Sequence, residues 1–258
     1  MTEKLIVEKQ TNTLIIKLNH PPANTFDAES LKALKQLVID TQDDKNILTL
    51  IITGIGEKFF SAGADLNSFA DHDAKNAAEM AKLFGEAFET LSQFEGVSIA
   101  AINGYAMGGG LECALACDIR IAECHAIMAL PETSVGLLPC GGGTQNLPWL
   151  VGEGWAKRMI LCGERVDAIK ANQIGLVEEV VERNESLNSA LKLAEQVSGQ
   201  SPLALRASKK LIQSARFCEM AAGYAVERQL FVSLFGSEDQ REGIDAFLAK
   251  RPPVWKNK

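Results

Sequence analysis

A run of three glycines followed by a glutamate is the part of this sequence best suited to chemistry. Glycines 108–110 follow a strand-like segment and come directly before Leu111 and Glu112. A second acid, Glu132, comes twenty residues later in the segment Leu130-Pro131-Glu132. Glycines at the start of a helix expose backbone N–H groups, which stabilise a developing negative charge, and a pair of carboxylates can move protons. The pattern predicts chemistry on a polarised carbonyl.

The first glycine run also has to be weighed as a phosphate-binding loop. Its spacing is not Gly-x-Gly-x-x-Gly, because Cys113 stands where the third glycine belongs, and no Gly-Lys-Ser/Thr follows. A structural turn is the other alternative, but three adjacent glycines lose conformational entropy that a helix start does not require. A second run, glycines 141–143 before Thr144, is equally compatible with a flexible turn and a functional backbone. The sequence therefore favours a functional first run and leaves the second open.

Two other catalytic classes lack their motifs in this sequence. Gly-x-Ser-x-Gly is absent, and His20, His72 and His125 are more typical of surface or turn positions than of a catalytic triad. The six cysteines contain no Cys-x-x-Cys pair, and Cys113 and Cys117 stand among apolar residues. We therefore expect reduced thiols in a cytoplasmic protein, and no metal site.

Composition and charge narrow the class of partner. The chain has 258 residues, 47 % of them hydrophobic and 23 % charged, and a formal net charge of −7. An acidic balance argues against a general nucleic-acid binder, and the first helical segment offers only Lys32 and Lys35 for an RNA-binding role. No apolar run approaches the roughly 18 residues of a membrane span, and the N-terminus resembles neither a signal nor a transit peptide. We expect no nucleic acid and no membrane among its partners.

The first half of the chain alternates between strand and helix patterns. Strand-like segments cover residues 5–8, 14–18, 47–53, 98–102, 118–122 and 126–130, and a helical stripe of large apolar residues covers 77–94. This alternation favours a parallel sheet with right-handed crossovers. After Thr144 the pattern is mainly helical, with typical helix starts at Ser201-Pro202 and Ser237. The helical tail is rich in aromatic residues, and we expect it to pack on a partner subunit as well as on its own core.

Several segments together carry a resemblance to a known family. They are residues 60–66, 103–112 with Cys117-Asp118, 131–136, Pro139 with 142–145, 175–177 and 242–251. In this order the chain resembles the crotonase superfamily, also called the enoyl-CoA hydratase/isomerase family, over essentially its whole length. The resemblance implies an α/β fold with a ββα spiral catalytic core over residues 1–195. It also implies a C-terminal helical oligomerisation region over residues 196–258, which mediates homotrimers that often pair into hexamers.

The resemblance also implies a shared chemistry, the stabilisation of a thioester enolate by two backbone amides. Carried onto this sequence, the donors of that oxyanion hole are the N–H groups of Ala64 and Gly109. The adenine side of coenzyme A is expected near Ala62, Asp65 and Leu66. A further residue of this set stands in the last helix, where Lys250 matches a basic residue that meets phosphate from a neighbouring subunit.

Members of the superfamily that act as hydratases typically carry two glutamates, and this chain has both. Glu112 matches the residue that activates water for attack at the β-carbon, and Glu132 the one that delivers a proton to the α-carbon. The resemblance implies an enoyl-CoA hydratase of lipid metabolism, with coenzyme A as part of the substrate and no separate cofactor. A Δ3,Δ2-enoyl-CoA isomerase and a lyase or decarboxylase of other acyl-CoA esters are the alternatives.

Some residues depart from the family pattern. Cys140-Gly141 replaces the usual Gly-Ala, Asn146 stands where arginine is frequent, and Asn67 where lysine is frequent. These changes affect the expected substrate range more than the reaction type. The acyl chain stays undefined at this stage, because the apolar residues that could border its pocket are equally compatible with core packing: Phe69, Met80, Phe84 and Phe88.

Overall fold

The computed structural model describes residues 2–69 and 73–258, except for the side chain of Phe69. His72, expected at a surface or turn, lies outside the described residues. The chain forms two compact units, Met1–Lys192 and Leu193–Lys258. The division expected after residue 195, between a catalytic and an oligomerisation region, concerns function and stays a prediction.

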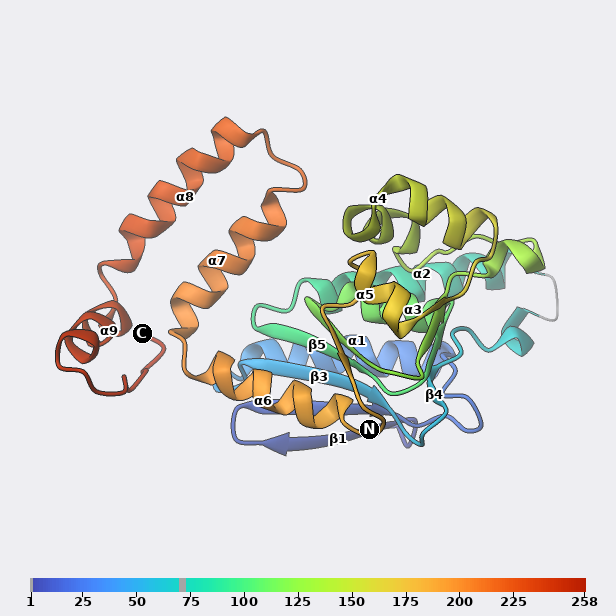
Figure 1. Cartoon of the computed structure of the whole chain (residues 1–258), viewed down its shortest axis with the longest axis horizontal. Coiled ribbons are helices and arrows are strands. Elements are labelled where there is room, and N and C mark those ends of the chain that lie inside the picture. The colour runs from blue at the N-terminus through green and yellow to red at the C-terminus, as the bar shows by residue number, and fades with distance from the viewer. Residues whose placement is uncertain (1, 70–72) are drawn as a thin grey trace. The chain divides into compact units, whose positions relative to one another are not determined.

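The first unit is built on two sheets (Figure 1). The larger sheet has six strands in the order β1-β2-β3-β5-β7-β10, and the smaller has four in the order β4-β6-β8-β9. The strands are β1 Leu5–Gln10, β2 Thr13–Leu18, β3 Thr49–Gly54, β4 Phe59–Ser61, β5 Val97–Ile102, β6 Tyr105–Met107, β7 Ile119–Glu123, β8 Ile127–Ala129, β9 Val166–Asp167 and β10 Glu179–Val181. The α-helices are α1 Ala28–Asp43, α2 Ala74–Ser92, α3 Gly109–Ala116, α4 Gly143–Leu161, α5 Ala168–Gln173, α6 Ser186–Ser198, α7 Pro202–Ser214, α8 Met220–Leu234 and α9 Glu238–Leu248.

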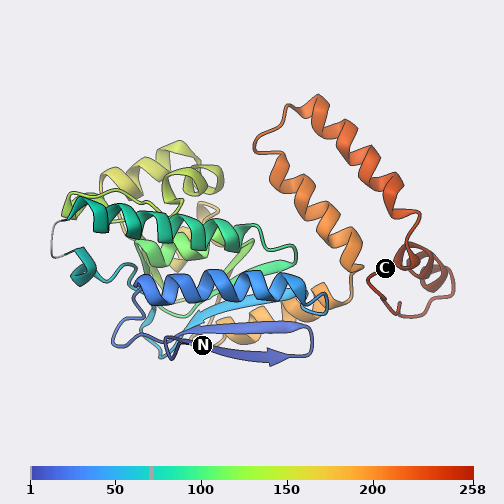
Figure 2. The ribbon, with the colours of Figure 1, turned by 180° about the vertical axis from the view of Figure 1, so that it is seen from behind.

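The larger sheet confirms the predicted parallel pairing. Strand β1 pairs antiparallel with β2, and from β2 through β3, β5 and β7 to β10 every pairing is parallel. All six residues of β3 are buried, as expected for an apolar β-branched strand that is covered on both faces. Helices α1 and α2 lie side by side along the sheet (Figure 2).

The helices of this unit form where the sequence supplies a cap and an apolar stripe. Helix α1 begins after Asp27, whose side chain accepts a hydrogen bond from the Ser30 amide. The predicted stripe of α2 is confirmed, because its large apolar residues are buried: Met80, Leu83, Phe84, Phe88 and Leu91. Phe84 and Phe88 pack edge-to-face against Phe26, which lies just before α1.

The smaller sheet aligns the chain segments that the sequence marked for chemistry. Strand β4 pairs parallel with β6, and β6 pairs parallel with β8. The strand expected over residues 126–130 is shorter, Ile127–Ala129, and the chain leaves the ladder before Pro131, which has no N–H to donate. Because the three strands run in the same direction, the loops that follow them meet at one edge of the sheet.

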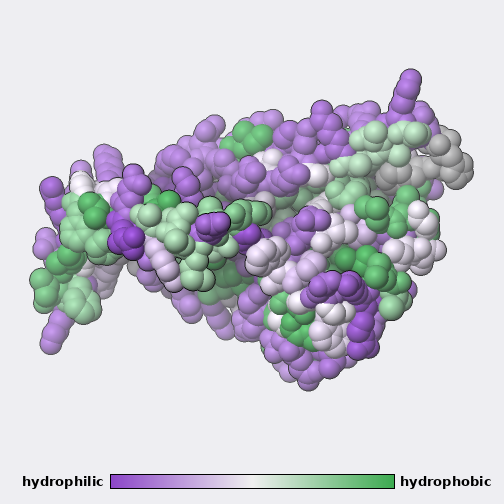
Figure 3. Space-filling view, turned by 90° about the horizontal axis from the view of Figure 1, so that it is seen from above, coloured by the Kyte–Doolittle hydropathy of each residue, from purple (hydrophilic) through white to green (hydrophobic). Residues whose placement is uncertain are grey.

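The second unit is helical. Ser201 caps α7 by accepting from the Ala204 amide, and Ser237 caps α9 by accepting from the Gln240 amide, as the sequence predicts. Large apolar side chains stand exposed on this unit: Ile212, Phe217, Met220, Tyr224, Phe231, Val232, Phe235, Phe247 and Leu248. The space-filling view shows hydrophobic residues of the chain at its surface (Figure 3). Among the described helices, none is both long and apolar enough to span a membrane.

Candidate active site

The site lies where three parallel strands of the smaller sheet end. The segment from Ala62 to Asp65 follows β4, residues 108–109 follow β6, and Pro131 and Glu132 follow β8. The loops touch closely: a Cβ added to Gly63 would lie 2.6 Å from the Met107 carbonyl oxygen and 2.9 Å from the Gly109 amide nitrogen. Gly63 also has a φ of +89°, a conformation that favours glycine. The two loops therefore pack backbone against backbone at Gly63.

Glu112 is buried in the first turn of α3 and held by two backbone amides. The side chain is 2 % exposed. Its Oε1 accepts hydrogen bonds from the Gly141 amide at 2.7 Å and from the Gly143 amide at 2.8 Å. A Cβ added to either glycine would lie 3.0 Å from a carboxylate oxygen of Glu112. The second glycine run, which the sequence left open, therefore holds this carboxylate.

The two amides also bear on the proton affinity of Glu112. Burial raises the pKa of its carboxyl group, and the hydrogen bonds from Gly143 and Gly141 work in the opposite direction because they stabilise the charged form. Both amides bind Oε1, and Oε2 has no hydrogen bond to any described residue. Glu112 is thus held as an acceptor with one oxygen left for a ligand.

Glu132 begins the short 3-10 helix Glu132–Val135 and has a different environment. Burial, and to a lesser degree the charge of Glu112, raises the pKa of Glu132 to about 7. Its Oε2 is buried and has no hydrogen-bond partner among the described residues. A Cβ added to Gly108 would lie 3.0 Å from Glu132 Oε1, so the glycine leaves room for this carboxyl group. With this pKa, Glu132 is present in both its protonated and its ionised form near neutral pH.

The amides of Ala64 and Gly109 are free to bind a ligand. The neighbours of Ala64 are engaged, since the Ala62 amide donates to Ala23, and the Asp65 amide donates to Phe26. The Ala64 amide itself has no acceptor among the described residues. The Gly109 amide also has none, because it lies in the first turn of α3, where amides have no acceptor within the helix. These are the two donors expected for an oxyanion hole, and that role stays a prediction.

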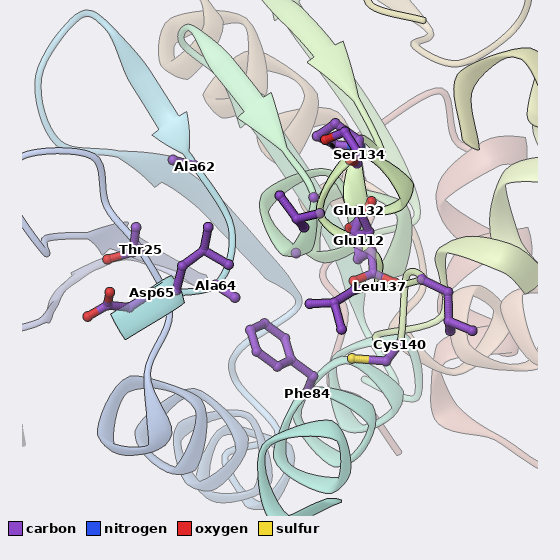
Figure 4. Close-up of a pocket in the computed structure, with 16 residues that line it drawn as sticks. Thr25, Ala62, Ala64, Asp65, Phe84, Glu112, Glu132, Ser134, Leu137 and Cys140 are labelled. Atoms are coloured by element: carbon purple, nitrogen blue, oxygen red, sulfur yellow. Dashed lines mark hydrogen bonds between the residues drawn. The ribbon is translucent and has the colours of Figure 1, made fainter. Parts of the chain in front are cut away.

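These groups line one cavity of about 410 Å³ (Figure 4). It contains both glutamates, the two free amides and the three expected coenzyme A residues of the first unit: Ala62, Asp65 and Leu66. Its remaining walls are mainly apolar. Lys250, the fourth expected residue, lies in the second unit just after α9. The structure therefore brings together the predicted residues of the first unit.

Comparison with known proteins identifies the family. The family model described as Enoyl-CoA hydratase/isomerase matches residues 8–258. The chain is 36 % identical to the short-chain-enoyl-CoA hydratase of Clostridium acetobutylicum, over 96 % of this chain and 95 % of that one. It is 41 % identical to the 2,3-dehydroadipyl-CoA hydratase of Escherichia coli, over 99 % of both chains. This chain belongs to the enoyl-CoA hydratase/isomerase family.

Solved structures agree with this membership. The structure of DspI from Pseudomonas aeruginosa superposes with a TM-score of 0.97 at 63 % identity, covering 99 % of this chain and 97 % of that one. The enoyl-CoA hydratase of Bacillus anthracis superposes with a TM-score of 0.96 at 34 % identity, covering 99 % and 100 %. The prediction of a crotonase-type α/β fold with C-terminal helices is confirmed. The protein is an enzyme of the enoyl-CoA hydratase type.

Sequence reasoning missed part of the cavity wall of this family member. Thr25, Leu137 and Leu138 line the cavity, and their spacing in the sequence carried no signal for it. Phe84 both packs in the core and lines the cavity, whereas Phe88 is core alone. Within the described residues, no group of three or more His, Cys, Asp or Glu side chains is arranged to hold a metal ion.

Proposed function

We propose that the protein adds water across the 2,3 double bond of an enoyl-CoA thioester and forms a 3-hydroxyacyl-CoA. The observation that carries this proposal is that two carboxyl groups with unlike environments line one cavity together with two free amides. A hydratase needs a base, an acid and donors for a thioester oxygen. An isomerase needs only one carboxyl group to shuttle a proton, so the presence of a second glutamate in the cavity favours hydration.

The reaction assigns one role to each group. Glu112 Oε2 takes a proton from water, and the water oxygen forms a bond with the β-carbon as the double bond opens. The electron pair moves to the thioester oxygen, which the Ala64 and Gly109 amides stabilise. Glu132 then delivers its proton to the α-carbon, and the proton that Glu112 took passes to solvent while Glu132 regains one from it before the next turnover. The step is redox-neutral and consumes only water, so coenzyme A enters as part of the substrate and no separate cofactor is required.

Hydration of crotonyl-CoA, followed by the loss of absorbance of the conjugated thioester, tests this function. We expect Glu112→Gln and Glu132→Gln each to lower kcat by about 10²–10⁴, because each removes a proton-transfer group. Turnover like that of the wild type in both variants would overturn the proposal. Rapid conversion of a 3-enoyl-CoA together with negligible hydration would assign the enzyme to the isomerases instead.

The remaining contacts with coenzyme A belong to this proposal. Ala62 and Asp65 line the cavity on the side of Thr25, and Leu66 also lines it. We assign the adenine end of coenzyme A to these three residues. Lys250 is assigned to a phosphate of substrate bound to a neighbouring subunit. Lys250→Ala should then raise the KM for crotonyl-CoA and leave kcat nearly unchanged. An unaltered KM would remove Lys250 from the site.

Assembly is proposed from the second unit. Its exposed aromatic side chains would be costly in water, with Phe217 at 85 % and Phe231 at 62 % exposed, and a homotrimer or a pair of trimers would cover them. Sedimentation should show a trimer or hexamer that Phe231→Asp dissociates. Gln229→Asp, at another exposed position of the same helix, is the matched control. A wild-type monomer would contradict the proposal.

The cellular setting is also proposed. All six cysteines are free thiols, which supports a reducing compartment such as the cytoplasm. The proposed substrate places the enzyme in fatty-acid metabolism. Cell fractionation, which locates the native protein, tests the proposed cytoplasmic location.

A further inference from the structure

Three buried phenylalanines pack together beside the active-site cavity. Phe26, Phe84 and Phe88, here called the phenylalanine cluster, are each at most 2 % exposed. Their ring centroids lie 5.5–6.2 Å apart, and each pair of rings meets edge-to-face. Phe84 reaches the cavity (Figure 4), whereas Phe26 and Phe88 are not among the described lining residues. The cluster is therefore a closely packed body with one edge at the site.

Phe26 fixes the peptide group that carries the Ala64 amide. The Phe26 amide donates to the Gly63 carbonyl oxygen at 2.7 Å, and Phe26 forms a parallel bridge with Ala64. The Gly63 carbonyl and the Ala64 N–H belong to one planar peptide group and point in opposite directions. The Asp65 amide donates to the Phe26 carbonyl oxygen at 2.9 Å and holds the next peptide group. The direction of the Ala64 N–H therefore follows the position of Phe26.

Phe84 contacts the backbone at the second free amide. A Cβ added to Gly109 would lie 2.7 Å from Phe84 Cε1 and 3.4 Å from Cζ, so the edge of the ring occupies the place of a side chain there. The Phe84 ring in turn packs on the Phe26 ring, with 6.2 Å between centroids and 80° between planes. One pair of rings thus connects Phe26, which orients the Ala64 amide, with the backbone of Gly109.

Phe88 extends the same contact to the loop that holds Glu112. A Cβ added to Gly141 would lie 2.7 Å from Phe88 Cδ2 and 2.9 Å from Cε2. The Gly141 amide donates to Glu112 Oε1 at 2.7 Å. The Phe88 ring also packs on the rings of both Phe26 and Phe84. Each ring of the cluster is therefore linked to one loop that supplies a backbone donor of the site.

We infer that the phenylalanine cluster positions the oxyanion hole, with Phe26 and Phe84 as positioning residues that fix the Ala64 and Gly109 amides relative to each other. This inference rests on the proposed function. Backbone donors stabilise an oxyanion only when both are aimed at the place it occupies. A misplacement of about 1 Å can cost about 10²-fold in rate. Closely packed rings resist such a displacement, because a buried side chain has few alternative positions.

Phe26→Leu tests the cluster without removing a described lining residue. The change removes the ring contact with Phe84 and leaves the backbone of residue 26 able to bond its partners. We expect kcat for crotonyl-CoA hydration to fall at least about tenfold and KM to change little, because the loss lies in the transition state. Phe94→Leu is the matched control: Phe94 is 2 % exposed, and its Cε1 lies 2.6 Å from a Cβ added to Gly96, away from the described lining.

The control separates positioning from stability. Urea unfolding should show a similar loss of stability in both leucine variants, since each shortens a buried ring. Phe94→Leu should nevertheless keep the wild-type kcat at a temperature where both variants are folded. An equal loss of kcat in the two variants, or a wild-type kcat in Phe26→Leu, would overturn the inference.

A spectroscopic measurement reports on the two amides directly. Butyryl-CoA labelled with ¹³C at the thioester carbonyl is a saturated ligand, and hydrogen bonds from an oxyanion hole lower the stretching frequency of that carbonyl. Infrared difference spectra at saturating ligand should show this lowering in the wild type and in Phe94→Leu. In Phe26→Leu the frequency should return part of the way toward that of free butyryl-CoA. A wild-type frequency in Phe26→Leu would overturn the inference.

The spectra also separate this inference from the proposed hydration. If the wild type lowers the carbonyl frequency without hydrating crotonyl-CoA, the proposed function fails, and the comparison of Phe26→Leu with Phe94→Leu still decides the role of the cluster. If bound butyryl-CoA keeps its free frequency in the wild type, the two amides form no oxyanion hole. That result would overturn the inference as well.

Discussion

Raising the pH from 7 to 9 should lower kcat/KM for hydration about 50-fold, because the change removes the proton that Glu132 must hold. Burial and the charge of Glu112 raise the pKa of Glu132 from 4.5 to about 7. With this pKa, about half of the free enzyme carries the proton at pH 7 and about 1 % carries it at pH 9. A glutamic acid with the ordinary pKa would be protonated in only about 0.3 % of molecules at pH 7. The site thus enlarges the competent population roughly 150-fold.

The same alkaline limb of the pH profile, which is the fall in kcat/KM above pH 7, should appear in the reverse reaction. Hydration neither takes up nor releases a proton overall, so both directions require the enzyme with one proton shared between Glu112 and Glu132. Dehydration of 3-hydroxyacyl-CoA should therefore lose kcat/KM over the same pH range. Activity should also fall toward acid pH in both directions, where Glu112, whose pKa is raised by burial, becomes protonated and no longer accepts a proton from water.

The assay is the absorbance of the conjugated thioester in buffers of constant ionic strength from pH 5 to 10. Glu132→Gln should lack the alkaline limb, because its side chain does not titrate. Glu153→Gln, an exposed substitution on α4, is the control and should keep the wild-type profile. A flat wild-type profile between pH 6 and 9 would refute the reasoning. An unchanged alkaline limb in Glu132→Gln would refute it too.

Three predictions concern stability. Because burial raises the native pKa of Glu132 above its unfolded value, native stability falls as the pH rises from about 4.5 to 7. Urea unfolding should show Glu132→Gln to be about 1–2 kcal/mol more stable than the wild type at pH 8 and little changed in stability at pH 4.5. The difference at pH 8 is this small because solvent screens the charge of a partly exposed carboxyl group. Gly110→Ala should destabilise by about 1–3 kcal/mol and lower activity, because its Cβ would lie 2.2 Å from the Ser61 carbonyl oxygen. Gly154→Ala, with nothing within 4 Å of its Cβ, should be neutral; equal effects would contradict this contact. Arg120→Met should cost about 3–5 kcal/mol, because the 2 % exposed guanidinium bonds a glutamate and three carbonyls; a loss below 1 kcal/mol would contradict that role.

Most of the fold could be predicted from local sequence patterns. The buried strand β3 and the stripe of α2 were predictable because burial follows a periodicity that can be seen within a few residues. The caps Ser201 and Ser237 were predictable for the same reason, since each bonds an amide three residues away. The C-terminal end of β8 was harder to predict, because the effect of Pro131 on strand pairing depends on how the strand lies in the sheet.

The site was predictable only in part, because its contacts are distant in sequence. Glycines 141–143 carried no decisive signal, since their partner Glu112 lies about thirty residues earlier and is reached only through the fold. Phe84 was ambiguous because the same ring packs on Phe26 and faces the cavity. The unlike proton affinities of the two glutamates depend on burial and on amide contacts that appear only in three dimensions.

Position 137 tests what holds the proton on Glu132. Burial is the largest cause of the raised pKa of Glu132. Leu137 lies beside this residue, since its amide donates to the Glu132 carbonyl oxygen at 3.0 Å. The cation introduced by Leu137→Arg should therefore stabilise the ionised form of Glu132 and move the alkaline limb of the pH profile to lower pH, whereas Leu137→Met should leave the limb in place. An unmoved limb in Leu137→Arg would contradict this account of the raised pKa.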